Sequence, residues 1–285
     1  MTYENPEALV STEWLAEHMS APDVRIVDAT SFLPTSDRDG KAEYNERHIP
    51  GAVYFDINDI ADETSDLPHM LPSPEKFSSK ARKLGLGDGN RIVVYDANGG
   101  YLAAARVWWT FRVFGHKDVV ILDGGLPKWI AEGRALDDLP TVPRERHFTA
   151  HVNHTLVRDR EKLIENIKTK RKQVIDARSA GRFTGTDPEP RATNKTGHIP
   201  GSLSLPFNKL MDPDNHFVMR SGTEIRAAID EAGIDMNQPI VASCGTGVTA
   251  CVIALGFYLI GRDDVAVYDG SWAEWGNHPS TPVEF

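Results

Sequence analysis

The chain has 285 residues, of which 40% are hydrophobic and 25% charged, as is typical of a globular protein with two domains. Its formal net charge of -10 at pH 7 argues against nucleic acid or an anionic membrane as the main partner. No apolar run is long enough to span a bilayer, and residues 1–18 lack the pattern of a secretory signal. Two cysteines, Cys244 and Cys251, are too few for a disulfide framework, so we expect a reducing, cytoplasmic location.

Short β-branched runs alternate with helical patterns along the chain. After a capped helix start at Ser11, buried parallel strands are predicted at 24–29, 52–55, 91–95 and 119–122. Helical spacing occurs at 74–84, 102–114 and 126–132, and in the second half at 223–232 and 248–259, with a strand at 239–243. Helix-ending glycines are expected at Gly85, Gly115, Gly233 and Gly261. This alternation predicts α/β architecture with doubly wound, mainly parallel sheets flanked by helices.

The sequence repeats itself once. The strand ending near Asp28 matches the one ending near Asp176, and the tetrapeptide His-Ile-Pro-Gly occurs at 48–51 and again at 198–201. The run 92–96 aligns with 240–244, which places Asp96 over Cys244. We therefore predict two tandem domains at 1–140 and 155–285, joined by a linker at 141–154 that is polar and contains Pro143.

The chemistry is expected after the strand at 239–243, where the segment 244–250 reads Cys-Gly-Thr-Gly-Val-Thr-Ala and turns the strand into a helix. Gly245 and Gly247 allow successive backbone N–H groups to point into one concavity, and the helix N-terminus adds its positive end. Such a loop should lower the pKa of Cys244 and make it a reactive thiol, whereas Cys251 lies in an apolar helix and is predicted to be core. A phosphatase loop would need an arginine where Ala250 stands, so phosphate-ester hydrolysis is disfavoured.

The cysteine loop resembles that of the 3-mercaptopyruvate sulfurtransferases of the rhodanese superfamily. The resemblance extends over nearly the whole chain and includes both His-Ile-Pro-Gly blocks and the motifs at 107–109, 123–126, 181–183, 188–191 and 268–272. It implies two tandem rhodanese domains, the first inactive, with Asp96 in place of the cysteine. It also implies a double displacement in which Cys244 takes sulfur from an anionic donor, releases pyruvate, and passes the sulfur to cyanide or to a thiol acceptor such as thioredoxin.

The resemblance also assigns roles to individual residues. Arg182 and Arg191 match the family's two substrate arginines, and the N–H groups of the loop would cradle the persulfide, which makes Gly245, Gly247, Val248 and Thr249 binding residues. In a serine–histidine–aspartate relay proposed for the family, the serine position holds Thr246 and the histidine position holds His69. The aspartate position holds Asn58, for which Asp56 or Asp59 would have to substitute. A hydrogen-bonded interdomain role for His69 is the alternative.

Two rival functions stay open at this point. A thiosulfate sulfurtransferase would perform the same chemistry with another donor, but members of that branch place basic residues directly after the cysteine, where this chain has Gly245 and Thr246. A sulfur-carrier or redox-sensing module would use Cys244 without needing donor-binding arginines. No cofactor or metal is expected, because His147, His151 and His154 lie in an extended segment that would not direct all three to one side. His48 and His198 are interpreted as structural turn residues, because both halves have them.

Overall fold

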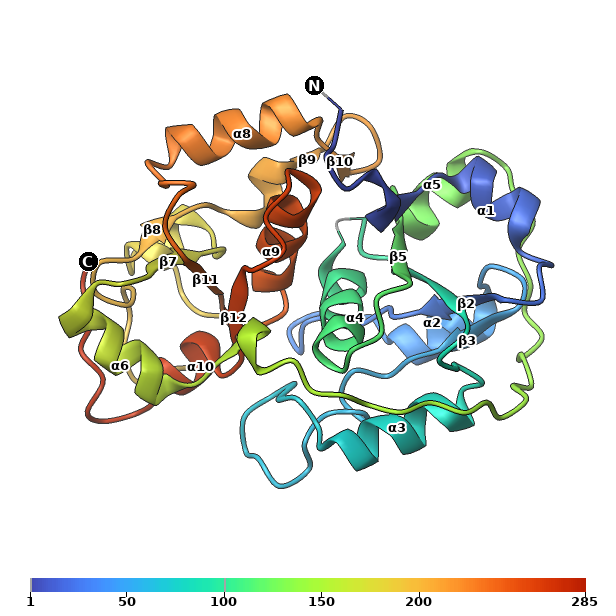
Figure 1. The fold of residues 1–285 in the computed structure, drawn as a ribbon, viewed down its shortest axis with the longest axis horizontal. Helices are drawn as coiled ribbons and strands as arrows, with labels where there is room; N and C mark the ends of the chain where they lie inside the picture. Colours follow the sequence, from blue (N-terminus) through green and yellow to red (C-terminus); the bar gives the residue numbers. More distant parts are fainter. Residues whose placement is uncertain (1, 100) are drawn as a thin grey trace.

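The structure is a computed structural model that describes residues 2–99 and 101–285, and it forms two α/β domains side by side (Figure 1). In the N-terminal domain five parallel strands follow the order β1-β5-β4-β2-β3. These strands are β1 (Leu9–Val10), β2 (Val24–Asp28), β3 (Ala52–Tyr54), β4 (Arg91–Tyr95) and β5 (Val119–Leu122). The helices are α1 (Thr12–His18), α2 (Gly40–Glu46), α3 (Pro74–Lys83), α4 (Leu102–Val113) and α5 (Gly125–Ala131), and a short 3-10 turn spans Pro6–Ala8.

The C-terminal domain repeats this arrangement, with five parallel strands in the order β6-β12-β11-β7-β8. The strands are β6 (Val157–Arg158), β7 (Gln173–Asp176), β8 (Leu203–Ser204), β11 (Ile240–Ser243) and β12 (Ala266–Tyr268). The helices are α6 (Arg160–Thr169), α7 (Ala180–Phe183), α8 (Gly222–Glu231), α9 (Ala250–Leu259) and α10 (Ser271–Trp275). A small hairpin of β9 (Met211–Asp212) and β10 (Val218–Met219) and two 3-10 turns, His154–Leu156 and Phe207–Leu210, complete it. Two sheets of identical strand order confirm the predicted α/β fold and its internal repeat.

Local sequence signals account for most element ends. The Ser11 side chain accepts a hydrogen bond from the Trp14 amide and caps α1. The four predicted stop glycines all have positive φ, between 69° and 92°, a conformation that favours glycine after a helix. The main difference is at α9, which begins at Ala250 rather than 248, because Gly247 has φ 72° and keeps the segment before it out of helical conformation.

The domains meet where α4 and α9 face each other at the centre of the molecule (Figure 1). Almost every side chain of both helices is buried, as expected for helices that are apolar on all sides. Trp108 and Trp109 of α4 are 2% and 1% exposed and Trp129 and Trp275 are equally buried, so these four tryptophans are core residues, as predicted. One shared core therefore holds the two sheets in a fixed relation.

The two His-Ile-Pro-Gly blocks have the same structural role. His48 is fully buried, and its Nδ1 lies 2.7 Å from the Tyr44 carbonyl, while Nδ1 of His198 lies 2.9 Å from the Phe183 carbonyl. Each histidine also pairs its backbone with a distant segment, His48 with Asp137 and His198 with Glu284. These contacts confirm both as structural residues.

The connection between the domains follows the surface of the N-terminal domain. Its backbone hydrogen-bonds there at Arg146, His147, His151 and Asn153 before β6 begins the second sheet. Within residues 2–99 and 101–285, no helix has the length and apolar character needed to cross a membrane.

Candidate active site

Cys244 follows β11, the central strand of the second sheet, and precedes α9. Its side chain is 2% exposed and lines a pocket of about 460 Å³. In the part of the chain that the structure describes, the backbone N–H groups of Gly245 to Thr249 have no hydrogen-bond acceptor. Because Gly245 and Thr246 also border the pocket, the loop carries unsatisfied donors beside the sulfur and can hold an anion there.

The first domain shows what such a cradle binds. Asp96 follows the central strand β4, at the position equivalent to Cys244, and its carboxylate accepts hydrogen bonds from the Asn98 and Ala104 amides at 3.0 and 2.9 Å. Burial raises the pKa of Asp96 to about 6, against the effect of these amide donors. The first cradle is thus occupied by the protein's own acid, while the second is open to a ligand or to a charged sulfur.

A buried arginine from the first domain fixes the cysteine loop. Arg106 of α4 is 3% exposed, donates from Nη1 to the Gly247 carbonyl at 3.1 Å, and forms an ion pair with Asp269 at 2.7 Å. It also donates to the carbonyl of His69, and Asp269 accepts from the Leu71 amide. Arg106 therefore joins the loop that contains His69 to the loop that contains Cys244.

Cys251 of α9 contacts the same loop on the side that faces the core. It is fully buried, its Sγ lies 3.1 Å from the Gly247 carbonyl, and burial raises its pKa. This agrees with the prediction that Cys251 is a core residue. Both cysteines are free thiols.

Arg182 reaches the pocket but is already paired. Its Nη2 lies 2.5 Å from Glu189, whose other oxygen accepts from the buried Arg178 at 2.7 Å. Arg178 also pairs with Asp176 at 2.6 Å. The Arg182 guanidinium lies directly over Gly245, because a Cβ atom at that position would stand 2.7 Å from Nη2. Arg182 thus borders the cysteine, but with most of its charge neutralised.

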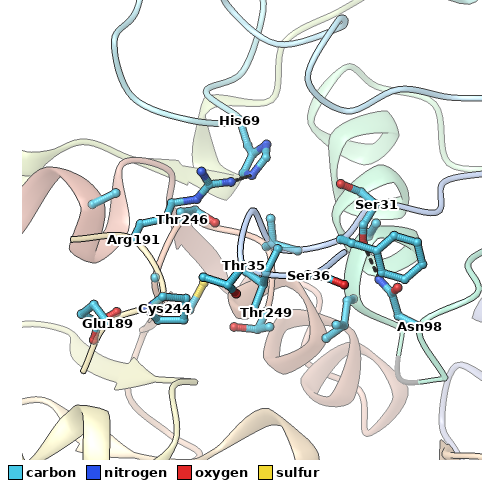
Figure 2. A pocket seen from close by; sticks show the side chains of 18 of the residues that line it. Ser31, Thr35, Ser36, His69, Asn98, Glu189, Arg191, Cys244, Thr246 and Thr249 are labelled. Atoms are coloured by element: carbon cyan, nitrogen blue, oxygen red, sulfur yellow. Dashed lines mark hydrogen bonds between the residues drawn. The ribbon is translucent and has the colours of Figure 1, made fainter. Parts of the chain in front are cut away.

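Arg191 is different, because it forms no ion pair with any carboxylate among the described residues. Its Nη2 lies 3.3 Å from Nε2 of His69, and Figure 2 shows the two side chains together on one side of Cys244. Burial lowers the pKa of Arg191, and burial together with the cations Arg106 and Arg191 lowers that of His69 to about 3. His69 is therefore neutral at physiological pH and accepts from the arginine, which is left free to bind an anion.

The acidic member of the relay has no counterpart in this arrangement. Asn58 is exposed, Asp56 accepts from the backbone amides of Asn58 and Asp59, and Asp59 pairs with Lys80. Nδ1 of His69 is buried and has no partner among the described residues. Neither Asp56 nor Asp59 substitutes for the family's aspartate, so any role of His69 in proton transfer operates without a charged partner.

The pocket thus collects every residue that the sequence singled out as catalytic or substrate-binding, apart from Gly247, which supports the loop from beneath. Three contributors were not predicted. Glu189 lies inside the motif at 188–191, and Arg106 directly precedes the motif at 107–109. Both residues are therefore in or next to a segment that carries the family resemblance. The segment 31–38 of the first domain, which forms the opposite wall, carries no motif at all.

Comparison with known proteins agrees with this site. The model of the rhodanese-like domain matches residues 11–132 and 159–278. The chain is 44% identical over 273 residues to human 3-mercaptopyruvate sulfurtransferase, and the match covers 94% of this chain and 91% of that one. It is also 44% identical over 274 residues to rat thiosulfate sulfurtransferase, with the same coverage. The crystal structure of SseA from Escherichia coli, a 3-mercaptopyruvate sulfotransferase, superimposes with a TM-score of 0.85 at 37% identity, covering 93% of this chain and 98% of that one.

Two matched domains identify the class: this is a tandem rhodanese-fold protein with one cysteine-bearing domain. The identity to curated relatives over nearly the full chain is more specific, and the chain belongs to the rhodanese family of sulfurtransferases.

Proposed function

We propose that the protein is a 3-mercaptopyruvate sulfurtransferase in which Cys244 carries the sulfur. The Cys244 thiolate attacks the donor's sulfur, the carbon–sulfur bond breaks, and its electron pair leaves on the enolate of pyruvate. The proton of the transferred S–H group moves to the enolate carbon, which gives pyruvate and a persulfide anion. The N–H groups of Gly245 to Thr249 stabilise that anion.

The balance of charged side chains around the pocket favours mercaptopyruvate over thiosulfate as the sulfur donor. Five arginines lie in or beside it, and four of them are matched by the carboxylates of Glu43, Asp176, Glu189 and Asp269. Among the described residues, Arg191 is the one pocket arginine without a carboxylate partner, so the site has one net positive charge for an incoming ligand. Mercaptopyruvate carries one carboxylate, remote from its sulfur, and satisfies this charge without leaving a second one unpaired.

Thiosulfate suits the pocket less well. It is a dianion whose charge lies next to the attacked sulfur, so its binding benefits from cations beside the cysteine. Gly245 and Thr246 provide none, and Arg182 above Gly245 is held by Glu189. We therefore place thiosulfate sulfurtransferase activity second.

Thr246 and His69 are the candidates for proton transfer to the departing enolate. Both line the pocket together with Cys244. His69 with a pKa near 3 is a poor base in the empty site, but a bound carboxylate on Arg191 offsets one of the two cations that lower this pKa. The Thr246 hydroxyl both accepts and donates, and relays a proton without changing charge.

For the second step we propose a thiol acceptor, such as thioredoxin, in the cytoplasm. The acceptor thiolate attacks the outer sulfur of the persulfide, the S–S bond breaks, and the Cys244 thiolate leaves. A reducing compartment suits two free cysteines. A sulfur carrier or redox sensor is the competing proposal, but it has no need for an unpaired arginine beside the thiol.

The test is to add mercaptopyruvate to the purified protein without any acceptor. We expect stoichiometric pyruvate release and a gain of one sulfur atom on Cys244 in intact-mass spectra, reversed by a thiol. Thiosulfate should load the protein more slowly. The matched variants are Cys244→Ser, which should abolish the gain, and Cys251→Ser, which should keep it; the opposite pattern refutes the assignment.

A further inference from the structure

The pocket has two walls of different chemistry. On the Cys244 side are Arg182, Glu189 and Arg191 of the second domain together with His69 of the first, whereas the segment 31–38 of the first domain forms the facing wall. Figure 2 shows Ser31 and Asn98 across the pocket from Arg191 and Glu189, with Thr35 and Ser36 between them. A three-carbon donor held on Arg191 occupies only part of this space.

The repeat makes the two walls equivalent in origin. The segment 31–38 follows β2 in the first domain, and the segment that contains Arg182 and Arg191 follows β7 in the second. Both are therefore the loop after the corresponding strand, and both face Cys244. The loop of the second domain recognises an anion, and the loop of the first has a different composition.

Within residues 31–38, all of which the structure describes, the facing wall has no free cation. Arg38 donates two hydrogen bonds to Glu43, at 2.6 and 2.7 Å, and stacks over the Phe32 ring at 4.0 Å. What it presents instead are the apolar side chains of Phe32 and Leu33 and the hydroxyls of Ser31 and Ser36. Leu33 is 52% exposed although it is a large apolar residue. This surface fits an uncharged body with apolar and amide groups, not a carboxylate.

The segment is held in place before any ligand arrives. The side-chain amide of Asn98 donates to the Ser31 carbonyl at 2.7 Å. The backbone amide of Thr30 donates to the Asp28 carboxylate at 2.8 Å, and that of Ser36 donates to the Leu33 carbonyl at 2.9 Å. A wall without regular structure but with fixed hydrogen bonds is preorganised for binding, which reduces the entropy lost when a ligand docks.

We infer that the segment 31–38 is the acceptor subsite, which binds the body of a cysteinyl peptide thiol while its sulfur attacks the Cys244 persulfide. The inference rests on the proposed function, because a sulfur carrier on Cys244 must admit a second substrate after pyruvate has left. The acceptor thiolate enters from the first-domain side, the S–S bond breaks, and the outer sulfur leaves as the acceptor's persulfide while Cys244 becomes a thiolate. Phe32 and Leu33 contact the acceptor's apolar part, and the hydroxyls of Ser31 and Ser36 contact its peptide groups.

The test separates the two half-reactions. Cys244 is loaded with inorganic polysulfide, so that loading does not depend on mercaptopyruvate, and discharge is followed by rapid-quench mass spectrometry. One acceptor is N-acetylcysteine amide, an uncharged cysteinyl unit, and the other is cyanide, which has no body to contact the wall. The variants are Phe32→Ala and Leu33→Ser, with Leu139→Ser in the segment that follows α5, 69% exposed, as the matched surface control.

We expect Phe32→Ala and Leu33→Ser to slow discharge by N-acetylcysteine amide about tenfold, the effect of losing apolar contacts in a binding pocket. Discharge by cyanide and single-turnover pyruvate release should stay unchanged, and Leu139→Ser should match the wild type. Leu33→Ser keeps the test valid if Phe32→Ala fails to fold, because Leu33 is 52% exposed and its replacement should cost little stability. Equal slowing with both acceptors, or no slowing with either, overturns the inference. Failure of mercaptopyruvate to load the wild type refutes the proposed function instead.

Glutathione and reduced thioredoxin, used as further acceptors with Leu33→Ser, identify the source of the cysteinyl unit. Selective slowing with glutathione indicates a small peptide thiol, and selective slowing with thioredoxin indicates a protein cysteine. Either result supports the subsite, whereas wild-type rates with both and with N-acetylcysteine amide overturn it.

Discussion

Replacing Arg191 with alanine should damage catalysis without damaging the fold. In the empty pocket Arg191 has no carboxylate partner among the described residues, and its contact with His69 is long, at 3.3 Å. Burial lowers its pKa, which means that its charge is held at some cost until a ligand compensates it. Removing it relieves that cost, so the free energy of unfolding should be unchanged or slightly higher.

The loss in catalysis follows from the bond that the arginine makes to the donor. A hydrogen bond to a charged group contributes about 1.5–3 kcal/mol, which corresponds to roughly 10- to 150-fold in kcat/KM for mercaptopyruvate. The carboxylate does not take part in the bond changes, so most of this factor should appear in KM. Arg191→Lys should fall between wild type and alanine, because it keeps the charge and loses the planar fork.

Arg182→Ala is the informative comparison. It removes one of the two cations that neutralise Glu189, a side chain only 8% exposed. We therefore expect Arg182→Ala to lower both activity and the unfolding midpoint, whereas Arg191→Ala lowers activity alone. Steady-state kinetics and chemical denaturation of both variants test this. Unchanged mercaptopyruvate kinetics in a folded Arg191→Ala protein would refute the role, and a fall in stability equal to that of Arg182→Ala would refute the reasoning about its charge.

Two further substitutions probe the loop. Arg106→Met leaves Asp269 buried without its partner, which should cost about 3–5 kcal/mol of stability. Adding Asp269→Asn should restore much of the stability but not the turnover. Recovery of both stability and turnover in the double variant would show that Arg106 does not position the loop. Thr246→Lys adds a second unmatched cation beside the sulfur, worth about 1 kcal/mol, and should raise the thiosulfate-to-mercaptopyruvate rate ratio about fivefold; an unchanged ratio in the folded protein contradicts the charge argument. Gly245→Arg is unsuitable for this purpose, because its Cβ would stand 2.7 Å from Nη2 of Arg182 and would displace that guanidinium from the pocket.

The fold was largely accessible from sequence because its strands are buried on both faces. The strands 91–95 and 119–122 were predicted to the residue, since continuous β-branched runs have few other interpretations. The helices Gly40–Glu46 and Arg160–Thr169 were not predicted, and their apolar positions are few: only Leu163 is fully buried in the second of them. The two-residue edge strands β1 and β6 pair with one neighbour only and leave almost no pattern.

The site was predictable where chemistry and a turn coincide. Cys244 between a strand and a glycine loop has a local signal, and so do two arginines in a recognised motif. No local sequence signal indicates how those two arginines are paired. Arg182 and Arg191 look alike in sequence, but in the described structure Glu189 pairs with Arg182 and not with Arg191. Arg106 meets Asp269 across 163 residues, a distance over which no spacing rule operates. Charge balance in a pocket is a property of the folded chain.

The first domain has an aspartate at the position equivalent to Cys244, and it still contributes to the site. The carboxylate of Asp96 fills the cradle of its own domain. Arg106 from α4 instead fixes the loop of the second domain, His69 lies against Arg191, and the segment 31–38 closes the pocket from the far side. With walls from both domains around it, Cys244 is only 2% exposed. In the proposed mechanism any thiol that reaches the persulfide discharges it, so the wall formed by the segment 31–38 would determine which thiol does.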